Sequence, residues 1–92
     1  DIDTHGFAIL NQFRTSFPSV NSFLMDRQTL MAHQTHWGME KTPTAADLSK
    51  LAREEAILYD ELRYNKIKTN LRLEQEFVDF SWVREVIRLI LT

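Results

Sequence analysis

The fold class of this 92-residue chain depends on residues 64–74, which read Tyr64-Asn65-Lys66-Ile67-Lys68-Thr69-Asn70-Leu71-Arg72-Leu73-Glu74. Apolar and polar side chains alternate there, as they do in a half-buried strand. The chain offers no second run of similar alternation and no Asn-Gly or Asp-Gly turn, and an isolated strand cannot satisfy its own backbone hydrogen bonds. We therefore favour a helix from about Asn70 to Ile90, with a break at Asp79 to Ser81 as an option. A strand over residues 64–74 remains the alternative.

The segments before residue 64 have the spacing of amphipathic helices. The first is expected to open at Asp3 or Thr4 and to end or bend at Pro18. The second is expected to be capped by Ser19 and to reach the Gly38 break. The third should start at Thr44, and its near-heptad apolar spacing is the strongest amphipathic signal in the chain. These segments predict helices joined by short loops.

The sequence therefore predicts one all-α domain spanning residues 1–92, a compact antiparallel bundle of three to five helices. Two glycines and two prolines are too few for the many turns of a β sandwich or barrel. We expect the core to contain Phe13, Phe17, Phe23, Leu30, Leu51, Leu58, Leu62, Phe77, Val83 and Ile87. The chain begins without methionine and stops inside its most hydrophobic stretch, so we expect a domain cut from a larger protein.

Composition narrows the classes of protein and site further. The net charge of −2 gives no global attraction to nucleic acid or anionic lipid. No apolar run is long enough to predict a transmembrane segment. Cysteine is absent, which removes disulfides and thiolate metal sites and favours the cytoplasm or another reducing intracellular compartment. Two isolated glycines cannot form a phosphate-binding loop, and no catalytic constellation is apparent, so we expect no enzyme activity and no cofactor.

Two histidines form the only candidate metal site in the sequence. His33 and His36 are three residues apart, which on a helix would place both imidazoles on neighbouring positions. A metal ion would need one or two carboxylates as well, from Glu40, Glu54 or Glu55. Nothing in the sequence brings these groups together, so a histidine and carboxylate metal site is our second alternative and the histidines are expected to bind no metal.

A basic stretch from residue 63 to residue 72 contains four cations and no acidic residue, namely Arg63, Lys66, Lys68 and Arg72. Lysine and arginine supply the salt-sensitive phosphate contacts of nucleic-acid-binding proteins. The preceding helix-loop-helix faintly resembles a helix-turn-helix element, although its loop is longer than usual. The alternative function is therefore a helical nucleic-acid-binding regulatory domain. If the cations bind nothing, the stretch is an ordinary charged surface exposed to solvent.

The carboxyl-terminal segment carries more apolar surface than one face of a helix can hold. At 100° per residue, Trp82, Val86 and Leu89 lie on a different side from Phe80 and Ile90. A subunit interface, the rest of a longer chain or an amphipathic membrane contact would explain this, and the alternative is a central helix buried on all sides by its own domain. We favour an interaction or oligomerisation module of a larger protein that binds another chain, or a second copy of itself, through Phe80, Trp82, Val86, Leu89 and Ile90.

Overall fold

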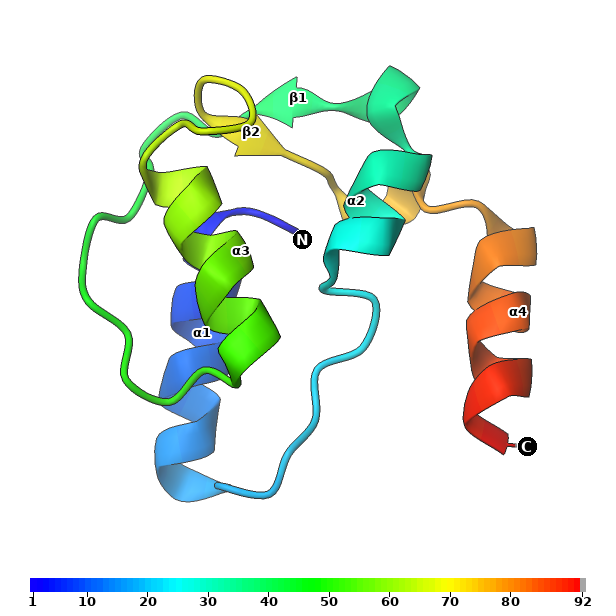
Figure 1. Ribbon diagram of the computed structural model, residues 1–92, viewed down its shortest axis with the longest axis horizontal. Coiled ribbons are helices and arrows are strands. Elements are labelled where there is room, and N and C mark those ends of the chain that lie inside the picture. The colour runs from blue at the N-terminus through cyan, green and yellow to red at the C-terminus, as the bar shows by residue number, and fades with distance from the viewer. Residues whose placement is uncertain (92) are drawn as a thin grey trace.

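The computed structural model describes residues 1–91 and is mixed α/β, about 53% helical with a small two-stranded antiparallel sheet. The prediction of an all-α bundle is therefore wrong. Figure 1 shows how the elements are arranged. In chain order they are α1 (Thr4–Ser16), α2 (Arg27–Ala32), the 3₁₀ turn η1 (Gln34–His36), β1 (Gly38–Met39), α3 (Arg53–Arg63), β2 (Leu71–Arg72), the 3₁₀ turn η2 (Gln75–Phe77) and α4 (Phe80–Leu91).

The strand that the sequence left as an alternative does form, and it finds two short partners. β2 pairs with β1 in an antiparallel register that places Gly38 opposite Arg72. The next residue, Leu73, exchanges two backbone hydrogen bonds with Ile2, at 2.9 and 3.1 Å between N and O. Neither partner is long enough to show alternation, so the sequence pattern could not reveal them. The expected helix from Asn70 was wrong for this reason.

Helix α1 begins where the sequence predicts, but it buries a different face. The Asp3 side chain caps it by accepting a hydrogen bond from the Gly6 N–H at 2.7 Å. Phe7 is fully buried, and its ring lies edge-on to Tyr59 of α3. Phe13, by contrast, is 51% exposed. The helix turns toward α3 the side that carries Phe7 and Arg14, because Arg14 forms a buried ion pair there.

The second and third helices are much shorter than predicted. α2 starts at Arg27 and is capped by Asp26 rather than by Ser19. α3 starts at Arg53, so the expected start at Thr44 was wrong. Residues 44–52 instead form a loop whose backbone groups bond to side chains of the helices. Thr44 N–H, for example, donates to the Thr4 hydroxyl at 2.7 Å. Because these backbone groups have side-chain partners, the segment does not need a helix to satisfy them.

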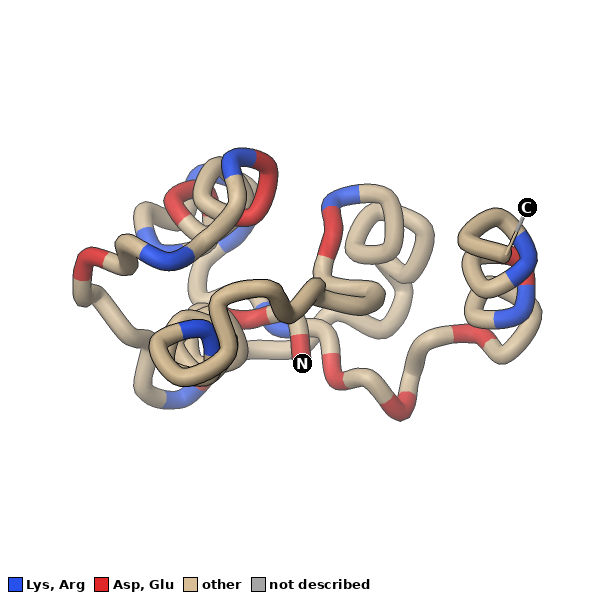
Figure 2. Tube along the Cα trace, turned by 90° about the horizontal axis from the view of Figure 1, so that it is seen from below, with Lys and Arg blue, Asp and Glu red and all other residues tan. Residues whose placement is uncertain are grey.

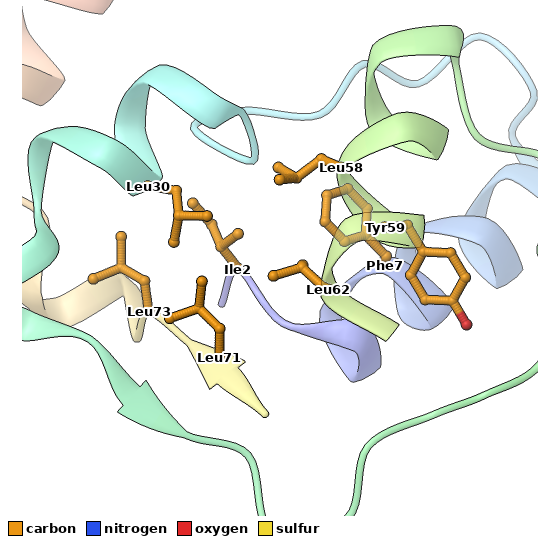
Figure 3. Close-up of a cluster of buried hydrophobic side chains, with 8 residues drawn as sticks. All are labelled: Ile2, Phe7, Leu30, Leu58, Tyr59, Leu62, Leu71 and Leu73. Carbon is orange, nitrogen blue, oxygen red and sulfur yellow. The ribbon is translucent and has the colours of Figure 1, made fainter. Parts of the chain in front are cut away.

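The core lies between α1, α3, α2 and the strands, as Figure 3 shows. It consists of eight side chains that are at most 2% exposed, namely Ile2, Phe7, Leu30, Leu58, Tyr59, Leu62, Leu71 and Leu73. Of the residues predicted to be buried, three are in this core: Leu30, Leu58 and Leu62. Leu51 and Val83 are half-buried, and the remaining five are exposed, namely Phe13, Phe17, Phe23, Phe77 and Ile87. Their faces point away from the small core that the strands and the extended N-terminus complete.

A buried ion pair joins α1 to α3. The Arg14 guanidinium donates two hydrogen bonds to the Glu55 carboxylate, which also accepts from the Ser22 hydroxyl at 2.5 Å and the Ala52 N–H at 2.8 Å. The Arg14 hydrogen bonds are the main cause that lowers the Glu55 pKa to about 2, and burial opposes them. This cluster fixes the two helices and both long loops relative to one another.

Candidate functional site

Helix α4 stands apart from the rest of the domain. It lies at one end of the molecule, beyond α2 and far from α1 and α3, in both Figure 1 and Figure 2. None of its twelve residues, all within the described part of the chain, is buried. In residues 1–91 no helix combines the length and apolarity needed to cross a membrane. α4 is therefore an isolated amphipathic helix on the outside of a small folded body.

The exposed side of α4 is strongly apolar. Phe80 is 74% exposed, Leu89 61% and Ile90 67%. Ile87 and Leu91 are exposed as well, although Ile87 was expected in the core. Phe80, Ile87, Ile90 and Leu91 lie on one side of the helix at 100° per residue, and we define these four as the apolar surface of α4; Leu89 lies on another side.

Two of the predicted partner-binding residues contact the domain itself. Trp82 is half-buried, and its indole N–H donates to the Thr29 hydroxyl of α2 at 2.9 Å between N and O. Val86 is half-buried on the same helix. Thus the structure does not bring all five predicted residues together on one outer surface. Trp82 attaches the helix to the body, whereas Phe80, Leu89 and Ile90 are exposed.

The charged residues of α4 give it a positive character. The helix carries Arg84, Arg88 and Glu85, a net charge of +1, on a chain whose net charge is −2. Arg88 pairs with Glu85 at 2.5 Å, and this hydrogen bond is the main cause that lowers the Glu85 pKa. The Arg84 guanidinium lies 5.5 Å from the Phe80 ring centroid. The apolar surface is thus bordered by arginines.

The two histidines do not form a pair of free metal ligands. His33 is 5% exposed and both of its ring nitrogens are engaged, Nδ1 with the Thr29 carbonyl at 2.7 Å and Nε2 with the Asp79 N–H at 2.9 Å. His36 is exposed and stacks on Phe77, with ring centroids 5.3 Å apart. No group of three metal-ligating side chains occurs among residues 1–91. The structure gives the metal hypothesis no support.

Two of the four cations in the basic stretch form ion pairs with carboxylates. Arg63 pairs with Asp47 at 2.8 Å and with Asp60 at 2.9 Å. Arg72 donates to Asp1 at 3.0 Å. The other two cations, Lys66 and Lys68, are exposed in the loop between α3 and β2. Two of the four predicted cations are therefore paired with carboxylates, and the nucleic-acid alternative stays a prediction.

Sequence reasoning missed an acidic cluster around the start of α1. The Glu40 carboxylate is buried and accepts from the Thr4 hydroxyl at 2.6 Å and the His5 N–H at 3.0 Å. Asp1 and Asp3 flank Ile2 and both face Arg72. The alternation of Asp1 and Asp3 directly before a helix was the available signal, because carboxylates favour helix N-termini.

Comparison with known proteins identifies the family. Neither the curated proteins nor the solved structures contain a match to this chain. A family model described as "Wadjet protein JetD, C-terminal" matches residues 1–87, which include the whole folded body and most of α4. The matched region is named as the C-terminal part of JetD, so the family is one domain of a larger protein. This chain belongs to the family of JetD C-terminal domains from the Wadjet system.

Proposed function

We propose that this domain is a protein-interaction module and that α4 binds another protein chain of the Wadjet system. The observation that carries the proposal is the exposure of the apolar surface of α4, where Phe80 and Ile90 are 74% and 67% exposed. An exposed apolar strip bordered by polar residues typically belongs to an interaction site. Membership of a family that is part of a multi-protein system supports a protein partner.

Burial of this surface would provide enough free energy for specific binding. Complete burial of one large aliphatic or aromatic side chain contributes about 1.5–3 kcal/mol. Phe80, Ile87, Ile90 and Leu91 are exposed by 43–80%, so much of this contribution is still available. In helix-in-groove recognition, apolar side chains three, four or seven positions apart on a helix enter a groove of the partner. We propose that the partner offers an apolar groove that fits one face of α4.

The charged residues beside the apolar surface of α4 predict the charge at the rim of that groove. Arg84 and Arg88 outnumber the single acidic residue of the helix, Glu85. An acidic border on the partner would complement them and would repel wrongly charged surfaces. Two copies of α4 packed together would bring arginines near arginines, which disfavours self-association through this helix. We therefore propose a different chain as the partner, with an apolar groove and acidic border.

The experiment compares Ile90→Glu with Ile9→Glu. Ile9 is 58% exposed on α1, so the same substitution is placed on a different exposed apolar surface. Binding of each purified variant to the other Wadjet proteins is measured by titration calorimetry. We expect Ile90→Glu to weaken binding at least about tenfold, which corresponds to about 1.4 kcal/mol. Ile9→Glu should bind like the unchanged chain, and both variants should keep its thermal midpoint.

Two results would contradict the proposal. Unchanged affinity of Ile90→Glu would show that α4 does not contact the partner. Sedimentation of the chain alone as a dimer that Ile90→Glu converts to a monomer would identify a second copy as the occupant of α4, in place of a different chain.

A further inference from the structure

The join between α4 and the body depends on two residues of the α2 region. Thr29 lies in α2 and is fully buried, and His33 is the residue at which α2 ends. The Trp82 indole N–H donates to the Thr29 hydroxyl, and the Asp79 N–H donates to His33 Nε2, each at 2.9 Å. The His33 ring also lies edge-on to the Trp82 ring, with centroids 5.9 Å apart. His33 therefore contacts both the residue before α4 and its first turn.

The hydrogen bonds of His33 require one protonation state. Nδ1 lies 2.7 Å from the Thr29 carbonyl oxygen, which can only accept, so Nδ1 carries a proton. Nε2 faces the Asp79 N–H, which can only donate, so Nε2 carries none. The imidazole is thus neutral in this arrangement. A second proton would place two donors face to face and would remove the bond between His33 and Asp79.

Once His33 is protonated, the charged groups around it would change its contact with Asp79. Among the described residues, the cavity beside His33 is also lined by Asp79 and His36. The Asp79 carboxylate accepts from the N–H and the hydroxyl of Ser81, which lowers its pKa, so it stays negative. An imidazolium would lose the bond to the Asp79 N–H and would be drawn toward the Asp79 carboxylate instead, so protonation would change how the residue before α4 contacts α2. The α4 residues at this cavity, Ser81 and Trp82, add no charge.

We infer that His33 is a protonation-controlled latch whose neutral ring holds the start of α4 in this position against α2 and whose protonated ring shifts it to another. Histidine side chains in general change their charge between about pH 5 and pH 8, which sets the two pH values of the test. The regulatory meaning of the latch rests on the proposed function of α4, because a shifted helix presents its apolar surface at a different angle. The latch itself concerns only contacts inside this chain.

The experiment measures the position of α4 in the whole chain without any partner. Because the chain has no cysteine, two can be introduced as labelling sites, Glu54→Cys in α3 and Ile90→Cys in α4. Spin labels on this pair give a distance distribution by pulsed electron paramagnetic resonance at pH 8 and pH 5. We expect one narrow distribution at pH 8 and a shifted or broadened one at pH 5. A control pair within the body, Gln12→Cys and Glu54→Cys, should give the same distribution at both values.

Two histidine variants test whether His33 is the group that responds. The amide oxygen of His33→Gln can take the place of Nε2 and accept from the Asp79 N–H, but this side chain does not titrate. We expect its distribution to stay narrow at both pH values, whereas His36→Gln should respond like the unchanged chain. An unchanged distribution in the original chain would overturn the latch, as would a response that persists in His33→Gln or disappears in His36→Gln. A change in the control pair would assign the response to unfolding and would also overturn it. No partner is present, so these results are independent of whether α4 binds one.

Discussion

The ion pair between Arg14 and Glu55 makes a quantitative prediction for Glu55→Gln. The substitution keeps the shape and one acceptor but removes the charge that faces the guanidinium. The pKa of Glu55 is lowered from 4.5 to about 2. At about 1.36 kcal/mol for each pKa unit, the ionised carboxylate contributes about 3 kcal/mol to the free energy of unfolding. Removing one partner of a buried pair independently costs about 3–5 kcal/mol. We therefore expect Glu55→Gln to lose about 3 kcal/mol at pH 7.

The pH dependence of this stabilisation follows from the lowered pKa of Glu55. A carboxyl whose folded pKa is depressed stabilises the fold above its ordinary value and loses this contribution as pH falls toward about 2. The difference between the original chain and Glu55→Gln should therefore shrink from pH 5 to pH 2. Urea unfolding followed by circular dichroism at several pH values measures it, with exposed Glu54→Gln as the control. A loss below about 1 kcal/mol at pH 7, or a difference that does not change with pH, would refute the reasoning.

Two further predictions concern the core and a helix cap. Leu73→Ala should lower the free energy of unfolding by about 2–5 kcal/mol because Leu73 is fully buried. The control Leu91→Ala, at an 80% exposed position, should change it by less than about 0.5 kcal/mol. Equal urea midpoints for the two variants would contradict this. Asp26→Ala should cost about 1 kcal/mol because the Asp26 side chain accepts the Thr29 N–H at 2.7 Å at the start of α2, and an unchanged midpoint would show that this cap does not stabilise the helix.

Local signals in the sequence predicted two helix boundaries, although the starts of α2 and α3 were predicted wrongly. Asp3 caps α1 as expected, and the break near Asp79 separates η2 from α4. Both depend on a polar side chain next to its own helix, which a short stretch of sequence contains. β2 was not predicted because its partners are only a few residues long and lie far away in sequence. Pairing of this kind is decided by tertiary structure.

The buried faces were predicted less well, because distant partners decide them. Apolar spacing alone assigned Phe13 and Phe17 to the core, yet α1 turns its other face inward to pair Arg14 with Glu55, 41 positions away. For the candidate site, the sequence indicated that α4 has too much apolar surface for one face. It could not indicate that Trp82 would attach the helix to Thr29, since that contact spans 53 positions.

The most direct test of the central claim is the accessibility of α4 in the assembled complex. A single Ile90→Cys substitution makes α4 reactive toward a maleimide, because the chain has no other cysteine and Ile90 is 67% exposed. Binding of the helix in an apolar groove should slow this reaction at least about tenfold when the other Wadjet proteins are added, whereas exposed Gln12→Cys should react at its original rate. An Ile90→Cys rate that stays the same in the free chain and in the complex would contradict the account.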